Sequence, residues 1–506
     1  MPVVKERSDD EDGARSGRER PIHFKNTMTE VGFVSVVLPA LLAEYFVSGF
    51  ALIIPDLIEN LDIPDSSSKW PAAAYSLIVS SVMLPLGRLA DIYGGRPIYI
   101  AGLVWLTIWS IVAGFSKDQY MLDICRALQG LGAGAFLPSG MMLLGQIYSP
   151  GPRKNLVSQG IYGACGAGGF FVGIFFAGLT AQFNAWPWYF WIGAILSFLG
   201  LITALIFIPR QQEQSQSKDQ KMDWLGAGLL ASSFILFVYA MTDSVQARDG
   251  FRTPYIIVTL VLGIVLFFIA IYVERNVAAQ PLLPFSIFTI PRMTPLLVAL
   301  FFTYGSLGIF LLYATLYCTN IMGATSLQLV AWFTPLAIGG CLIGIFGGFI
   351  LHLISGTTLV LFSGLCWIVA PLLFALAPKG ANFWAWIFTS MTCATLGIDI
   401  TFNVTTIFIT SSLPPSQQGL AAALINSIMQ LSIAICLGVS TVIEEATKEK
   451  GLLHSYRSVF WFEVGCASLA LCILTTFIKI DSANADSSSV RKVDTNNASS
   501  GASCAS

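Results

Sequence analysis

The sequence predicts an all-α polytopic membrane protein with fourteen transmembrane helices. Of its 506 residues, 55% are hydrophobic and only 11% are charged, less than half the charged share that is usual for a soluble domain. A spanning helix needs about 20 apolar residues, because a hydrocarbon core of about 30 Å is crossed at about 1.5 Å per residue. Fourteen such helices would use roughly 280 residues and leave only short loops and two tails. These proportions exclude a soluble enzyme, a nucleic-acid-binding protein and a disulfide-linked secreted domain.

Apolar segments of this length alternate with short polar stretches along the chain. Two polar stretches at the ends, residues 1–31 and 481–506, carry few apolar residues and are expected to be disordered tails. The fourteen expected spans are 32–55, 70–87, 98–115, 120–148, 156–180, 186–208, 223–242, 254–274, 295–317, 326–351, 357–377, 383–410, 416–443 and 458–479. Tryptophan and tyrosine are expected at the membrane–water boundary, in clusters that open the sixth and twelfth spans.

The distribution of basic residues predicts which loops lie on the cytoplasmic side of the membrane. In the first half, the loops after spans 2, 4 and 6 hold Arg88, Arg96, Arg153, Lys154, Arg210, Lys218 and Lys221, whereas the loops after spans 1, 3 and 5 hold only Lys69 and Lys117. Because loops rich in Lys and Arg stay in the cytoplasm, the even-numbered loops are expected there. An even number of spans then places both tails in the cytoplasm.

A weak internal repeat divides the chain. Gly87 and Gly95 flank the loop after span 2, and Gly348 and Gly356 flank the loop after span 10 with the same spacing. GLVW at 102–105 then matches GLCW at 364–367. This pattern fits two halves of six spans, at 32–208 and 281–480, separated by a cytoplasmic linker and two inserted helices at 209–280.

The loop after span 2 reads GRLADIYGGR. Gly87 lets the end of span 2 approach another helix closely, and Gly94 and Gly95 allow a very tight turn. Its charged residues, which can cluster at the membrane surface or cap a neighbouring helix, are Arg88, Asp91 and Arg96. We expect this loop to control opening at the cytoplasmic side; the alternative is a simple anchor of positive charge.

Three spans carry polar residues that apolar surroundings should exclude. Glu44 lies near the middle of span 1, Asp399 near the middle of span 12, and Arg126 and Gln129 in span 4. An Arg inside a span costs about 2.5–3.5 kcal/mol on insertion scales, so Arg126 needs a partner or a water-filled cavity. The alternative is that its side chain extends to the nearby membrane surface.

A polar stripe surrounds Asp399 on its own helix. Thr392, Thr395, Asn403 and Thr406 lie three or four residues apart around it and therefore share one helical face. Such a stripe should face protein or water, and an intramembrane acid is usually functional. Hydrogen bonding between helices is the structural alternative. Asn426 and Gln430, one turn apart in span 13, are weaker candidates.

In their ordered form, these motifs resemble the major facilitator superfamily. GRLADIYGGR resembles its motif after span 2, and RALQGLG at 126–132 resembles its Arg-x-x-Gln-Gly-x-Gly motif in span 4. The fourteen-span layout is similar to its drug:proton antiporter branch, and PGPRKN at 150–155 to fungal members. Further segments similar to that branch are Trp186–Phe190, Gln280–Pro284 and 411–435. The resemblance implies the major facilitator fold and one cavity faced by Glu44, Arg126 and Asp399.

Two departures from the branch concern spans 5 and 1. The span-5 motif of the branch contains Gly-Pro, whereas this chain reads GACGAGGFFVG with Gly169 in place of the Pro. The helix-packing glycines Gly163, Gly166, Gly169 and Gly173 still allow close packing or bending. In span 1 the branch often carries an Asp where this chain has Phe46.

The resulting hypothesis is a secondary transporter that exports a drug, toxin or secondary metabolite by alternating access. No nucleotide-binding Gly-x-x-x-x-Gly-Lys-Ser/Thr loop is present, so a proton gradient is the expected energy source. A buried carboxylate is the usual proton carrier. We expect no cofactor, no metal and no nucleic acid, a monomer in the lipid bilayer, and a plasma-membrane location with the vacuolar membrane as the alternative.

Three other function classes were weighed against export. An uptake carrier for an amino acid, ammonium or an organic acid stays open, because the Pro of span 5 is missing. A membrane-embedded enzyme would need clustered His, Cys or acidic residues at one depth, and the sequence offers none. A receptor or scaffold would leave the intramembrane acids unexplained.

Overall fold

The computed structural model describes most of the chain between residues 27 and 477. Its described ranges are 27–64, 67, 70–147, 162–183, 185–208, 222–244, 247, 250–278, 280–282, 286–353, 355–378, 380–412 and 418–477. The segment 150–155 and almost all of both predicted tails lie outside these ranges. So do residues 413–417, within the segment 411–435.

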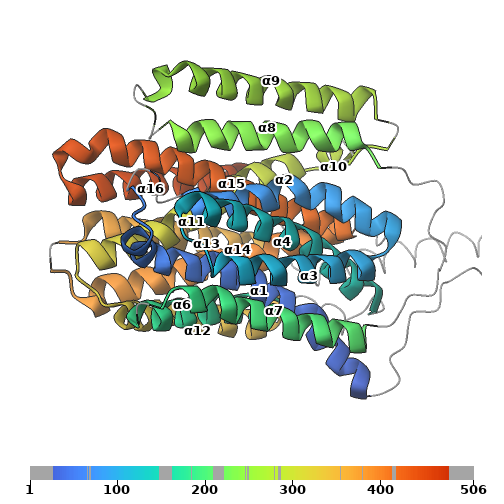
Figure 1. Cartoon of the computed structure of the whole chain (residues 1–506), viewed down its shortest axis with the longest axis horizontal. Helices are drawn as coiled ribbons and strands as arrows, with labels where there is room; N and C mark the ends of the chain where they lie inside the picture. Colours follow the sequence, from blue (N-terminus) through green and yellow to red (C-terminus); the bar gives the residue numbers. More distant parts are fainter. Residues whose placement is uncertain are drawn as a thin grey trace, which may run out of the picture.

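Within these ranges the secondary structure is entirely helical (Figure 1). The long helices are α1 (Thr27–Asn60), α2 (Trp70–Tyr93), α3 (Gly95–Ala113), α4 (Gln119–Ile147), α6 (Tyr162–Gln182), α7 (Pro187–Phe207), α8 (Trp224–Asp243), α9 (Pro254–Asn276), α11 (Met293–Asn320), α12 (Ser326–Leu353), α13 (Gly356–Leu376), α14 (Thr389–Ser412), α15 (Gln418–Thr447) and α16 (Leu452–Phe477). Short elements are η4 (Gly250–Arg252), α10 (Ser286–Thr289), η5 (Phe383–Phe388) and η7 (Lys448–Lys450).

Twelve helices in the described part of the chain are long and apolar enough to cross a membrane. They correspond to all the predicted spans except the fourth and fifth, so the count of fourteen is not confirmed. Those two segments are also helical: α4 and α6 pack inside the bundle. Within the described part of the chain, α6 contributes the shorter apolar stretch Gly168–Gln182.

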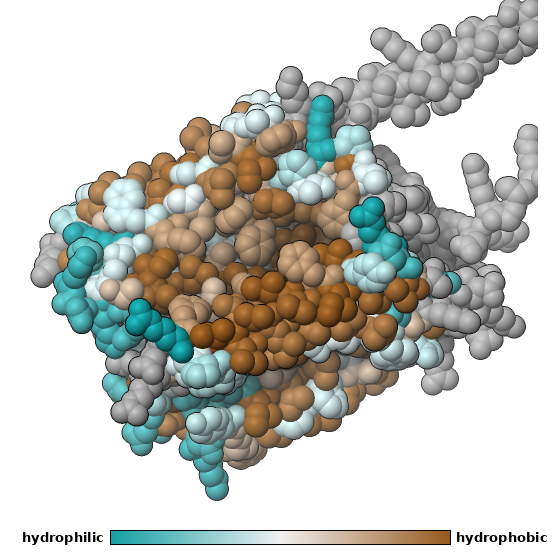
Figure 2. All heavy atoms as spheres, turned by 90° about the horizontal axis from the view of Figure 1, so that it is seen from above, coloured by the Kyte–Doolittle hydropathy of each residue, from teal (hydrophilic) through white to brown (hydrophobic). Residues whose placement is uncertain are grey.

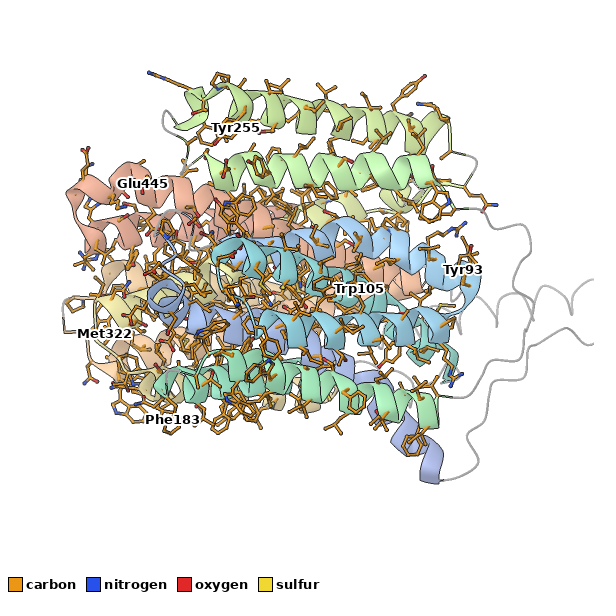
Figure 3. All side chains as sticks on the ribbon, in the orientation of Figure 1. Tyr93, Trp105, Phe183, Tyr255, Met322 and Glu445 are labelled. Atoms are coloured by element: carbon orange, nitrogen blue, oxygen red, sulfur yellow. The ribbon has the colours of Figure 1, made fainter. Side chains whose placement is uncertain are left out.

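Successive helices run back and forth along one direction. Tyr93, at the end of α2, lies at one end of the bundle. At the opposite end lie four residues that follow or border the fifth, seventh, ninth and thirteenth predicted spans: Phe183, Tyr255, Met322 and Glu445 (Figure 3). This alternation is the arrangement that the even and odd loops predict.

Twelve of the long helices form two sets of six. The first set is α1, α2, α3, α4, α6 and α7, the second is α11 to α16, and corresponding helices have corresponding neighbours. α1 packs on α6, α3 on α4 and α7; in the same way α11 packs on α15, and α13 on α14 and α16. The repeat seen in the sequence falls at equivalent places, because α3 begins at Gly95 and α13 at Gly356. The sets meet mainly through two pairs, α2 with α15 and α6 with α12.

The helices α8 and α9 stand outside both sets. α8 contacts α2 and α15, so it lies along one of the two seams between the sets, whereas α9 packs on α8 (Figure 1). Gly263 allows close packing within this hairpin, since a Cβ there would be 2.9 Å from the backbone nitrogen of Phe237. On the other face, Leu77, Val238 and Ala434 join α2, α8 and α15 in a small buried cluster.

The outer surface has the pattern that lipid requires. Hydrophobic side chains cover the middle of the face seen in Figure 2, and hydrophilic ones gather at its two ends. Exposed residues of α9 on this apolar surface include Val258, Val261, Leu262, Val265 and Phe268. A large exposed apolar band is stable in a bilayer and unstable in water, which agrees with the membrane class that composition predicts.

The aromatic cluster at the start of α7 is mostly core, which corrects the prediction of a boundary belt there. Trp188 is 52% exposed, but Trp186, Tyr189 and Phe190 are buried. Tyr189 stacks on Tyr45 of α1, and each hydroxyl donates a hydrogen bond of 2.6 Å to the other residue's carbonyl. These residues therefore join α7 to α1. At the second predicted cluster, Trp384 is exposed as expected.

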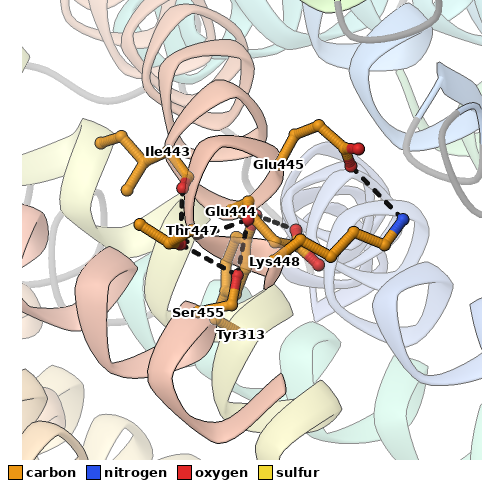
Figure 4. A network of polar contacts seen from close by, with 7 residues as sticks. All are labelled: Tyr313, Ile443, Glu444, Glu445, Thr447, Lys448 and Ser455. Atoms are coloured by element: carbon orange, nitrogen blue, oxygen red, sulfur yellow. Dashed lines mark hydrogen bonds and ion pairs between the residues drawn. The ribbon is translucent and has the colours of Figure 1, made fainter. Parts of the chain in front are cut away.

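A polar network fixes the turn between α15 and α16 (Figure 4). Ser455 donates to the carbonyl of Glu444 at 2.7 Å, and Thr447 donates to Ser455 at 3.1 Å. Tyr313 of α11 donates to the Glu444 carboxylate at 2.7 Å. The contact between Tyr313 and Glu444 therefore holds the turn between α15 and α16 against α11.

Candidate functional site

A cavity of about 120 Å³ lies between the two sets of helices. It is lined from one set by α1, α4 and α6, and from the other by α11, α12, α14 and α15. Most of its lining is apolar. The polar lining side chains are Glu44, Tyr304, Asp399, Asn403, Asn426 and Gln430.

Glu44 and Asp399 reach this cavity from opposite sets. Glu44 lies near the middle of α1 and Asp399 near the middle of α14, and both side chains remain partly exposed to the cavity. Their carboxyl groups are close enough to interact electrostatically. The structure therefore brings together two acids that are 355 positions apart in the chain (399 − 44).

The polar stripe on α14 divides between two surroundings. Asp399 and Asn403 line the cavity, and the Asn403 amide donates to the Asp399 carbonyl at 2.8 Å. Thr395 is buried against α12, where its hydroxyl lies 3.1 Å from the carbonyl of Leu336. Thr392 bonds its own helix, to the carbonyl of Phe388. Of the weaker candidates, Asn426 and Gln430 both line the cavity.

Arg126 is 1% exposed, which rules out the alternative that it extends to the membrane surface. Its guanidinium donates to the carbonyl of Pro71 at 3.1 Å, the carbonyl of Phe46 at 2.9 Å and the Gln129 side chain at 3.1 Å. Gln129 in turn donates to Ser110 at 3.0 Å. The pair thus links α1, α2, α3 and α4.

The expectation that Arg126 faces the same cavity as the two acids is not met. The rings of Phe50 and Tyr75 lie 4.0 and 4.5 Å from its guanidinium carbon. Its side chain borders a smaller cavity of about 30 Å³, which shares Val47, Leu311 and Ile433 with the main cavity. The reason is that backbone carbonyls and aromatic rings, rather than a carboxylate, provide the partners that a buried Arg needs. Gln129 is likewise absent from the main cavity lining.

The glycines of α6 allow it to lie against α1. A Cβ at Gly169 would be 2.2 Å from the carbonyl oxygen of Leu41, and one at Gly173 would be 2.7 Å from that of Tyr45. Gly166 lines the cavity beside Glu44, and Gly163 lies in the first turn of α6. A proline ring at 169 would meet the same carbonyl, so this packing accounts for the glycine there.

The loop after α2 makes the tight turn that its glycines predict. Gly94 alone separates α2 from α3, and its φ of 94° lies in the region that favours glycine. Arg96 donates to the carbonyl of Leu205 at 3.3 Å, near the end of α7, as expected of a helix cap. Asp91 is exposed and interacts electrostatically with Arg88.

Because α2 extends to Tyr93, Gly87 and Arg88 of this motif lie on the helix rather than in a loop, and both contact other parts of the protein. Arg88 donates to the Gln280 side chain at 2.9 Å, which ties the end of α2 to the segment before α10. At Gly87 an added Cβ would lie 3.4 Å from Pro138 of α4 and 3.6 Å from Ala423 of α15. Gly87 therefore sits where α2 meets the other set of helices.

We expect Gly87→Val to slow transport and Gly87→Ala to leave it nearly unchanged. An alanine Cβ makes ordinary van der Waals contacts with Pro138 and Ala423, whereas the two further methyl groups of valine push α2 and α15 apart. A loss of about tenfold corresponds to about 1.4 kcal/mol. Initial rates in vesicles, normalised to protein amount, measure it. Equal rates for both variants would show that this contact does not control turnover.

Sequence reasoning missed two buried acids, Glu274 of α9 and Glu463 of α16. Glu463 of α16 is fully buried, and neither carboxyl oxygen has a hydrogen-bond partner among the described residues. Its signal is the one that identified Glu44, a lone acid in an apolar span. It is not among the residues that line the cavity. In the part of the chain that is described, no group of three or more His, Cys, Asp or Glu residues is placed to hold a metal ion.

Comparison with known proteins identifies the family. A profile of the Major Facilitator Superfamily matches residues 36–437. A low affinity ammonium transporter of Saccharomyces cerevisiae is 33% identical, over 91% of this chain and 90% of its own length. The efflux pump terJ of Aspergillus terreus is 32% identical, over 89% of this chain and 88% of its own.

Solved structures agree on the fold. An auto-inhibited peptide transporter of the POT family superposes with a TM-score of 0.62 at 16% sequence identity, covering 89% of this chain and 98% of its own. At this identity the likeness concerns the fold alone. The family profile and the two fungal relatives show that this chain belongs to the major facilitator superfamily.

Proposed function

We propose that this protein is a proton-coupled secondary transporter that exports a small organic compound by alternating access. The observation that carries the proposal is the pair Glu44 and Asp399, placed by opposite sets of helices in one cavity at their junction. Movement of the sets relative to each other would change which side of the membrane this cavity meets. Protons and substrate would then compete for the same carboxyl groups.

The proposal includes the finer architecture. All fourteen long helices cross the bilayer, with six in each half and α8 and α9 inserted between them. Both tails lie in the cytoplasm, and the plasma membrane is the location. The division at 32–208, 209–280 and 281–480 is supported by the matching neighbours of the two sets. The turn at Gly94 and the Arg88–Gln280 contact then form a cytoplasmic latch.

Export is favoured over uptake by three fungal relatives named as efflux pumps or a multidrug transporter. Uptake is the second candidate, because the ammonium transporter is similar to this chain at the same level of identity. The absence of the span-5 proline also keeps uptake open.

Comparison of cells with and without the protein tests the function and its direction. For an exporter, compounds carried by the protein are retained less in cells that contain it, and a protonophore removes the difference. The matched control is a strain with the Asp399→Ala variant at the same membrane level. Greater retention in cells with the wild-type protein would establish uptake. Identical retention that a protonophore does not change would refute proton-coupled transport.

A further inference from the structure

The cavity between the two sets of helices has an unbalanced charge. It contains two acids, and no Lys, Arg or His is found among the described residues that line it. Arg126 is the only cation among the buried residues that the structure describes, and its guanidinium is bound to two backbone carbonyls and Gln129 beside the smaller cavity. A carboxylate in such surroundings is stable only when it is protonated or paired with a cation.

The other titratable groups near the acids do not supply the missing charge. Tyr75 interacts electrostatically with Glu44, and Tyr304 and Cys341 do so with Asp399. None of these three side chains is a cation. An anionic substrate entering the cavity would therefore find no opposite charge, whereas a cation could take the place of a proton.

The hydrogen-bonding groups of the cavity place a second, independent requirement on its ligand. Gln430 of α15 lines the cavity and is 2% exposed, and its side-chain oxygen has no hydrogen-bond partner among the described residues. Ser48 and Asn403 donate to the backbone carbonyls of Glu44 and Asp399, and both acids line the cavity beside Gln430. A buried acceptor without a donor destabilises the protein. The Gln430 oxygen and an ionised carboxylate can only accept hydrogen bonds, so a ligand that satisfies them carries N–H or O–H donors.

Size and apolar lining limit the ligand further. About 120 Å³ is several times the roughly 10–15 Å³ that holds one water, so the cavity takes a small organic ion rather than a large drug. Phe170, Phe402 and Leu336 provide an apolar wall for a hydrocarbon body. Such a cavity suits an ion with one charged end and one apolar end.

We propose that the substrate is a small protonated amine whose N–H groups bind the Glu44 and Asp399 carboxylates and the Gln430 side-chain oxygen. This inference rests on the proposed function, since it names the substrate of the same cavity. Before binding, the two neighbouring acids share one proton; the amine displaces this proton and binds both carboxylates, so the exchange of one cation for another leaves the charge of the cavity unchanged.

Four probe compounds with one ring and different polar ends test the proposal on the purified full-length chain. At neutral pH, benzylamine has a positive charge and N–H donors, whereas benzyltrimethylammonium has a positive charge without such donors. Benzyl alcohol is neutral and has one O–H donor, and benzoate has a negative charge. Binding is measured from the rise in unfolding temperature with ligand concentration. Benzylamine should bind about tenfold or more tightly than each of the others, and its addition to weakly buffered protein should release protons.

Matched variants assign the binding to residues. Glu44→Gln, Asp399→Asn and Gln430→Met should each weaken benzylamine binding by about tenfold, and Gln430→Met should narrow the gap to benzyltrimethylammonium. Glu463→Gln, which removes a buried acid outside the cavity lining, should bind benzylamine like the wild type. Benzoate binding that equals or exceeds that of benzylamine, or no benzylamine binding at all, would overturn the proposal. So would equal losses in the Glu463 and Asp399 variants.

Transport in vesicles separates this proposal from the one on which it rests. If benzoate binds and accumulates against its gradient when a pH gradient is applied, proton-coupled transport stands and the amine assignment falls. If benzylamine binds through the three residues but no pH gradient moves it, the assignment of the site stands and the transport function falls.

Discussion

Gly169→Ala should prevent α1 and α6 from packing and leave little correctly folded protein. The added Cβ would lie 2.2 Å from the carbonyl oxygen of Leu41 and 2.5 Å from its Cα. Real contacts of this kind are not shorter than about 3 Å, and the clash is with backbone, which cannot rotate away as a side chain can. Overpacking of a core costs about 1–3 kcal/mol when side chains yield, so a larger loss is expected here.

The same helix provides the control. Gly168 has nothing within 4 Å of an added Cβ, so Gly168→Ala should be neutral or should stabilise the helix by about 0.5–1 kcal/mol. The unfolding temperature in detergent and the fraction of protein that elutes as a single peak compare the two variants. If Gly169→Ala is as stable as Gly168→Ala, the helices are not packed in this way, and the position of Glu44 beside Gly166 is also in doubt.

Helices were predictable from the sequence because each apolar segment is long and continuous. All fourteen predicted segments lie on long helices, and Gly94 was identified because a one-residue turn demands its backbone conformation. Boundaries were less exact: α1 begins at Thr27, within the predicted tail.

The candidate site was predictable only in part, because partners from distant segments leave no local pattern. Glu44 and Asp399 stand out as lone acids in apolar spans, and both line the cavity. Arg126 stands out equally but is bound by the carbonyls of Phe46 and Pro71, which carry no side-chain signal. The Arg88–Gln280 contact joins residues 192 positions apart and could not be read from spacing.

Asp399→Asn should abolish transport driven by a pH gradient while substrate exchange across the membrane continues. Asparagine keeps the shape of a protonated Asp but cannot release a proton, so coupling fails before binding does. Asn403 donates to the backbone carbonyl of residue 399, not to its side chain, so this contact survives the substitution. Reconstituted protein is compared with and without a pH gradient, and gradient-driven uptake should fall to the level of empty vesicles.

Glu44→Gln identifies which acid carries the proton. The two carboxyl groups interact across the cavity, so removing one charge alters the other, and only a comparison of both variants separates coupling from binding. If Asp399 carries the proton, Glu44→Gln retains some gradient-driven transport with weaker substrate binding. Asp399→Ala should do worse than Asp399→Asn, because it also removes a polar centre from α14. If Asp399→Asn still concentrates substrate at the normal rate, Asp399 is structural, and loss of coupling in Glu44→Gln would assign the proton to Glu44.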